Sequence, residues 1–129
     1  MNKKILILSF LSVLFLAAGP IRAAIGVTNL RTEQLKNPSG IDTHQPRLGW
    51  RIESNEQNVM QTAYHILVAS SPDLLAQGKG DMWDSGKVET DASQWITYQG
   101  ENLKRNAPYF WKVKVYTNKG ESDWSSPAF

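Results

Sequence analysis

The stretch "YFWKVKVY", residues 109–116, decides the fold of this chain. Neighbouring side chains of a β-strand point to opposite faces of the sheet. An extended chain here therefore has one apolar face and one mixed face: Tyr109, Trp111, Val113 and Val115 on the first, and Phe110, Lys112, Lys114 and Tyr116 on the second. The pattern predicts a half-buried strand, and "NKG" at residues 118–120 predicts a tight turn after it.

Two further stretches alternate in the same way. In "RLGWRIE", residues 47–53, Leu48, Trp50 and Ile52 share one face, and in "AYHILVASS", residues 63–71, so do Tyr64, Ile66 and Val68. Weaker strands are expected at residues 25–33, 94–98 and 126–129. Several short strands separated by turn signals in a chain of this size predict an all-β fold, an antiparallel β-sandwich.

One short helix is expected within "SSPDLLAQGKG", residues 70–80. Ser71 suits the N-cap, Pro72 suits the first helical position, and Asp73 suits the first turn. Gly78 suits the stop.

The first 23 residues have the pattern of a signal peptide. Lys3 and Lys4 precede an apolar run over residues 5–18, and small residues follow, so we expect cleavage after Ala23. A membrane anchor is the alternative, but the run is shorter than the ~20 residues that span a bilayer. We therefore expect one exported domain, residues 24–129, in the periplasm, at the cell surface or outside the cell.

Charge and composition narrow the function classes. Without Lys3, Lys4 and Arg22 the basic residues fall from 14 to 11 against 12 acidic ones, a formal charge of −1. We therefore expect no nucleic-acid partner and, after cleavage, no membrane partner. The chain has no cysteine and two histidines, His44 and His65, so we expect neither a metal site nor a cofactor.

The segment "MWDSGKV", residues 82–88, raises the question of catalysis. Hydrolysis of glycosides needs two carboxyl groups ~5–10 Å apart. Asp84 meets Asp81 or Glu89 only through a chance of turn geometry, and Ser85 lacks a histidine nearby in the sequence unless His65 is adjacent in space. We expect no catalytic residue here.

The segment "LKRNAPYFWKVKVYTNKGESDWS", residues 103–125, resembles strands F and G of a fibronectin type III domain. Tyr109 suits a tyrosine corner, in which its hydroxyl bonds to backbone upstream. The alternative is that Tyr109 only packs inward. The resemblance also assigns structural roles to Trp50, as the core tryptophan, and to Trp111, as an inward residue.

Three longer blocks, residues 29–52, 64–88 and 107–129, resemble the N-terminal immunoglobulin-like domain of secreted bacterial α-L-rhamnosidases, which act on plant or microbial glycans. They contain "NPSGIDTHQPRLGW", "DMWDSGKV" and "YFWKVKVYTNKGESDWS". The resemblance implies a non-catalytic accessory domain whose partner is a catalytic domain further along the parent chain. It implies that "DMWDSGKV" is a strand and a bend, in which Trp83 packs beneath a loop and Asp84 bonds local backbone. It also implies a fragment truncated in its last strand. Because Pro127 cannot donate a backbone hydrogen bond there, we expect the edge of strand 109–116 to be partly unpaired and prone to self-association.

A stand-alone carbohydrate-binding or adhesion module is the alternative function. Five tryptophans are many for so small a core, so some are expected at the surface. The candidates for contact with sugar or with a neighbouring domain are Trp83, Trp95, Tyr98 and Trp124. Core packing is the simpler interpretation of each.

Overall fold

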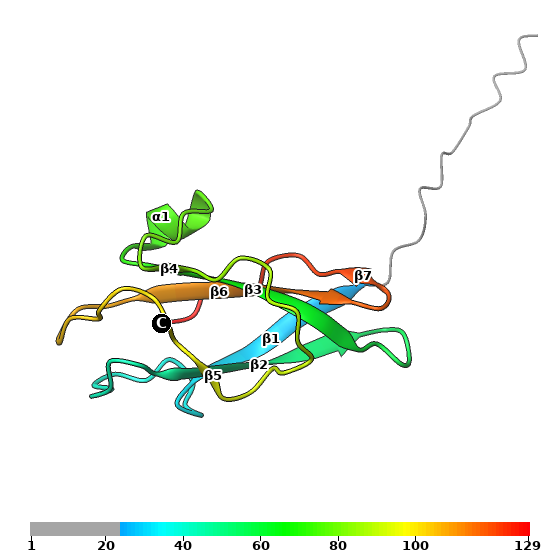
Figure 1. Ribbon diagram of the computed structural model, residues 1–129, viewed down its shortest axis with the longest axis horizontal. Helices are drawn as coiled ribbons and strands as arrows, with labels where there is room; N and C mark the ends of the chain where they lie inside the picture. The colour runs from blue at the N-terminus through cyan, green and yellow to red at the C-terminus, as the bar shows by residue number, and fades with distance from the viewer. Residues whose placement is uncertain (1–23) are drawn as a thin grey trace, which may run out of the picture.

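Two antiparallel sheets face each other in the computed structural model, which describes residues 24–129 (Figure 1). The first sheet has the strand order β1-β2-β5, and the second has the order β4-β3-β6-β7. The elements are β1 (Ile25–Thr32), β2 (Arg47–Ser54), β3 (Gln61–Ala69), α1 (Pro72–Ala76), β4 (Trp83–Asp84), β5 (Ile96–Thr97), β6 (Phe110–Thr117) and β7 (Gly120–Glu121). This confirms the predicted all-β sandwich with one short helix.

The expected signal peptide, residues 1–23, lies outside the described residues. Among the helices of residues 24–129, none is both long enough and apolar enough to span a bilayer.

The core lies between the two sheets and consists of the predicted inward faces of the strands. Trp50 from β2, Ile66 from β3 and Val113 from β6 are almost fully buried there. The Trp50 indole packs edge-on against Tyr64, with 5.3 Å between ring centroids, and its Nε1–H donates to Oε1 of Gln61 at 3.1 Å. The core role predicted for Trp50 is confirmed. Trp111 is also buried, and its Nε1–H has no hydrogen-bond partner within the described residues.

Helix α1 begins as the sequence predicts. Ser71 is the N-cap, its hydroxyl accepts a hydrogen bond from the backbone N–H of Leu74 at 3.2 Å, and Pro72 opens the helix. The helix lies on the outer side of the second sheet (Figure 1) and covers Leu67 and Ala69 of β3. These two residues face away from the main core, yet they are buried, because Leu75 of the helix packs on them.

The tyrosine corner is present. The hydroxyl of Tyr109 accepts a hydrogen bond from the backbone N–H of Lys104 at 2.8 Å. This bond ties the loop before β6 to the first residue of the predicted strand, as the fibronectin type III resemblance implies.

The free edge expected along β6 does not exist, and this expectation was wrong. Residues 122–128 follow β6 although they do not form a regular strand. Trp111 and Ala128 exchange two backbone hydrogen bonds of 2.9 Å. Pro127, the residue before Ala128, has no N–H to donate, and the pairing does not need one from it. Further along, the N–H groups of Ser122 and Ser125 donate to carbonyl groups of β6, and their hydroxyls accept from N–H groups of β6.

Candidate functional site

The "WDSGKV" segment is a short strand with a turn after it. Trp83 and Asp84 form β4 and pair with Val68 and Leu67 of β3. Oδ1 of Asp84 accepts the backbone N–H of Gly86 at 3.0 Å, which confirms the expected bond to local backbone. The same oxygen lies 2.6 Å from Nε2 of His65. The Gly86 N–H first, and then His65, hold the pKa of Asp84 below its ordinary value, so this carboxylate is ionised at neutral pH.

His65 and Asp84 are adjacent in space although 19 positions separate them in the sequence. Sequence reasoning considered His65 as a metal ligand and as a partner of Ser85, and missed this pair. The one available signal was that His65 lies in a predicted strand and that the family resemblance implies a strand and a bend at Asp84, but the sequence does not reveal how the two strands pair.

Ser85 is not an activated nucleophile. Its hydroxyl donates to the carbonyl of Gly86 and accepts from the N–H of Ile66, both at 2.8 Å. The group is therefore committed to backbone on both sides, and it fastens the turn after β4 to strand β3.

The nearby carboxylate of Asp81 is likewise engaged in hydrogen bonds, in this case with Ser70. It accepts from the backbone N–H of Ser70 at 2.9 Å and from the Ser70 hydroxyl, and these bonds lower its pKa. A glycosidase needs one carboxyl group whose raised pKa keeps it protonated as the general acid. Asp81 and Asp84 are both shifted in the opposite direction, so this pair does not have the electrostatics of a glycosidase acid.

Tyr98 was a candidate for surface contact, and the structure contradicts this. Only 2% of its surface is exposed, because the ring, just after β5, packs in the main core. Its hydroxyl donates to the carbonyls of Glu101 at 2.7 Å and Met82 at 3.1 Å. Burial raises the pKa of Tyr98 to about 12.

Trp83 is half-buried. It packs edge-on against Tyr98, with 5.3 Å between ring centroids. Gly100 lies so close to Trp83 that a Cβ on the glycine would come within 2.5 Å of the tryptophan Cβ. Trp83 thus packs beneath the loop that contains Gly100, as expected from the sequence.

Trp124 is half-buried on the outer side of the second sheet, beside the small core under α1. The ring of His65 packs edge-on against it at 5.0 Å. The ammonium groups of Lys112 and Lys114 lie 5.0 and 5.8 Å from its ring centroid. Groups of this chain therefore already occupy much of the space around the indole.

Trp95 differs from the other three candidates because 55% of its surface is exposed. It immediately precedes β5, and the guanidinium of Arg47 lies 4.5 Å from its ring centroid. Arg47 is itself held by Glu33 through a two-pronged ion pair whose shortest N–O distance is 2.8 Å. Of the sequence-predicted candidates, this is the one that offers an aromatic surface to a partner.

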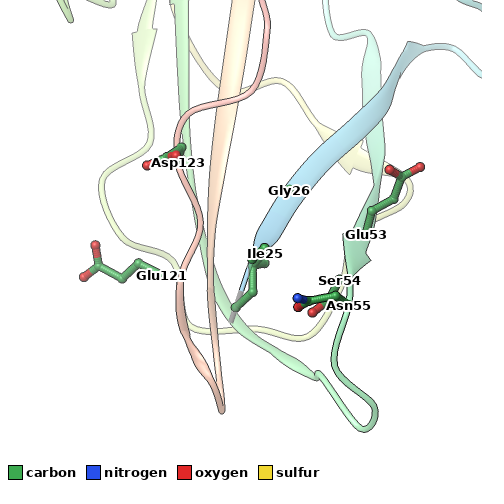
Figure 2. Close-up of a pocket in the computed structure, with 8 residues that line it drawn as sticks. Ile25, Gly26, Glu53, Ser54, Asn55, Glu121 and Asp123 are labelled. Atoms are coloured by element: carbon green, nitrogen blue, oxygen red, sulfur yellow. The ribbon is translucent and has the colours of Figure 1, made fainter. Parts of the chain in front are cut away.

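One surface hollow in the described residues is open and acidic. Its volume is about 710 Å³, and Figure 2 shows Glu121 and Asp123 on one side of it and Glu53 on the other. Nothing aromatic lines it. Within residues 24–129, no three His, Cys, Asp or Glu side chains gather closely enough to hold a metal ion.

The chain is similar to known protein domains over most of its length. Residues 27–129 match the model of a family described as the Rha78A-like, N-terminal immunoglobulin domain. An α-L-rhamnosidase of Formosa agariphila is 43% identical over 94 residues, which cover 72% of this chain and 10% of that protein. An α-L-rhamnosidase of Streptomyces avermitilis is 40% identical over 108 residues, which cover 83% of this chain and 10% of that protein.

Solved structures give the same result. The crystal structure of the Streptomyces avermitilis α-L-rhamnosidase complexed with L-rhamnose superposes with a TM-score of 0.76 at 40% identity, over 81% of this chain and 10% of that one. The α-L-rhamnosidase from Dictyoglumus thermophilum gives a TM-score of 0.77 at 35% identity, over 80% of this chain and 12% of that one. The chain thus spans about a tenth of the length of the curated relatives that it matches.

Proposed function

Because this chain belongs to the Rha78A-like N-terminal immunoglobulin domains, we propose that it is the non-catalytic accessory domain of an α-L-rhamnosidase acting on plant or microbial glycans. Its role is to pack against the catalytic part of that enzyme and to support it. The observation that carries the proposal is the extent of the match. Nearly all of residues 24–129 aligns with one small N-terminal domain of much longer α-L-rhamnosidases.

The geometry of the "WDSGKV" segment supports a non-catalytic role. Its carboxylate and its hydroxyl hold the turn and the neighbouring strand in place through backbone bonds. An accessory domain needs a rigid sandwich, and these bonds supply rigidity rather than chemistry.

A domain exchange tests the proposal. The N-terminal domain of the Streptomyces avermitilis α-L-rhamnosidase is deleted, or replaced by residues 24–129 of this chain, or replaced by an unrelated fibronectin type III domain as a control. We expect deletion and the unrelated domain to lower the melting temperature of the enzyme, and residues 24–129 to restore it. Equal melting temperatures for all three proteins would contradict a supporting role.

The absence of catalysis has its own test. The purified chain should not hydrolyse an aryl α-L-rhamnoside above the buffer rate. Hydrolysis that disappears in the Asp84→Asn variant would show that the segment is catalytic after all.

Export is part of the proposal, on the grounds of the basic, apolar and small-residue pattern of residues 1–23. The mature N-terminus in the exported fraction should be Ala24. An intact N-terminus in a membrane fraction would contradict it.

A further inference from the structure

Trp95 has a costly backbone conformation at an exposed position. Its φ is 58°, in the left-handed region where a bulky L-residue is strained. An exposed tryptophan gains little from burial that would offset this strain, and such outliers concentrate at functional sites. The position therefore needs an explanation other than packing.

The loop that carries Trp95 is fastened to the core from several directions. The buried Gln61 donates through its side-chain amide to the carbonyls of Thr90 at 3.1 Å and Ala92 at 2.8 Å. The carbonyl of Ser93 accepts the N–H of Trp50 at 2.9 Å. These bonds fix the loop over residues 90–93, so the strained residue next to it cannot relax by moving the loop.

The residue before Trp95 adds a further bond. The side-chain amide of Gln94 donates to the carbonyl of Trp50 at 2.7 Å. The Gln94 side chain lies close to Gly49, where an added Cβ would come within 2.6 Å of the Gln94 amide oxygen. The absence of a side chain at Gly49 thus makes room for the side chain that orients Trp95.

Arg47 supports one side of the Trp95 ring. Its guanidinium lies 4.5 Å from the ring centroid, a cation–π contact. Glu33 holds this guanidinium at Nε and at one terminal nitrogen. The bond from Arg47 lowers the pKa of Glu33, so both groups are charged at neutral pH and neutralise each other. With one face supported and more than half of its surface exposed, the indole presents its other face to solvent.

We propose that Trp95 is a carbohydrate-binding platform that takes one pyranose ring of a neutral glycan. The C–H groups on one face of a pyranose carry partial positive charge and stack on the electron-rich face of an indole. The ring lies against the charged Arg47, which Glu33 holds, whereas the centre of a protein interface is depleted of charge. Hydroxyl groups of the sugar find hydrogen-bond partners in these two side chains, and the neutralised Arg47–Glu33 pair favours a neutral sugar over an acidic one.

Nuclear magnetic resonance of the isotope-labelled chain tests the proposal, because each tryptophan gives its own indole N–H signal. The probes are L-rhamnose, the sugar in the crystal structure of the Streptomyces avermitilis relative, and D-glucose and D-galactose. We expect at least one of them to shift the Trp95 signal saturably and to leave the buried Trp50 and Trp111 signals unchanged.

Two variants separate binding from folding. Trp95→Gly should weaken binding at least tenfold while the melting temperature stays equal or rises, because glycine adopts a positive φ without strain. Trp124→Ala, the matched control on the other sheet, should bind as the wild type does. A lower melting temperature for Trp95→Gly would make Trp95 structural and overturn the proposal. So would a Trp95 signal that no sugar shifts, or that only the remainder of a rhamnosidase shifts.

Discussion

Tyr98 is a residue whose ionisation is coupled to folding. Burial raises its pKa from an ordinary value of 10.0 to about 12, and its hydroxyl donates to two backbone carbonyls. Between these pH values the folded protein keeps a proton that the unfolded chain has lost. The free energy of unfolding therefore falls as pH rises through this window. Below it, the ionisation of Tyr98 has no effect on stability.

We expect the free energy of unfolding to fall between pH 10 and pH 12, with Tyr98 contributing about 2 kcal/mol of the decline. In Tyr98→Phe this contribution should be absent, while the effect of Tyr64, whose pKa burial also raises, remains. Urea unfolding of both proteins across this range measures the difference. Parallel declines in the two proteins would contradict the coupling.

The tyrosine corner makes a second prediction at single-residue scale. Tyr109→Phe removes the acceptor of the Lys104 N–H and keeps the ring. We expect a loss of about 1 kcal/mol of stability, measured by urea unfolding. Tyr116→Phe is the control, because the Tyr116 hydroxyl makes no hydrogen bond within the described residues. Equal losses in the two variants would show that the corner bond contributes nothing.

Single residues were the scale at which the sequence misled most. Tyr98 and Trp95 were both candidates for the surface because both are aromatic residues of the stretch "QWITY", residues 94–98. A strand over these residues already turns positions 95 and 98 to opposite faces, because they are three residues apart. The sequence does not reveal which face is inward, which follows from the pairing of β5 with β2, nor the left-handed backbone at Trp95, which bulky residues rarely adopt.

The elements were easier to predict where a period repeats. The alternating runs became β2, β3 and β6 with the expected faces inward, and Ser71 and Pro72 marked the start of α1 correctly. Residues 122–128 have no such period. They pair with β6 through serine hydroxyls as well as backbone, so long-range geometry rather than local pattern determines their path.

Ser122 and Ser125 therefore carry the prediction at the scale of elements. Both are buried, and their hydroxyls accept the backbone N–H groups of Val115 at 2.9 Å and Val113 at 3.1 Å. Replacing either serine by alanine should lower the free energy of unfolding by about 1–3 kcal/mol, because a buried N–H donor is then left without a partner.

Hydrogen exchange locates the effect. The Val113 amide should exchange faster in Ser125→Ala, and the Val115 amide in Ser122→Ala, each more than the amides of β2. Ser126→Ala is the control, because its side chain is exposed. Unchanged exchange at both valines would mean that the hydroxyls do not serve as acceptors.

At the scale of the whole molecule, the exposure of the outer strand edges of the two sheets determines whether the protein is monomeric. Residues 122–128 cover β6. At the outer strand of the other sheet, Asn29 has a φ of 52°, and the register of β1 against β2 shifts between Thr28 and Arg31. Such a bulge interrupts the regular row of backbone groups that a second chain would need for pairing.

We therefore expect residues 24–129 to be monomeric by light scattering, contrary to the self-association that the sequence led us to expect.

A chain ending at Glu121 removes the segment that pairs with β6, so it exposes the N–H and C=O groups of Trp111, Val113 and Val115. That shorter chain should self-associate or fail to fold, because an open strand edge beside an uncovered core favours pairing with another chain. If both chains are monomeric and melt at the same temperature, residues 122–128 do not protect the edge, and the sandwich is stable without them. If residues 24–129 instead dimerise with rising concentration, the bulge at Asn29 does not block the β1 edge. An added Thr28→Pro substitution should then disrupt the dimer only if β1 pairs through that residue's N–H.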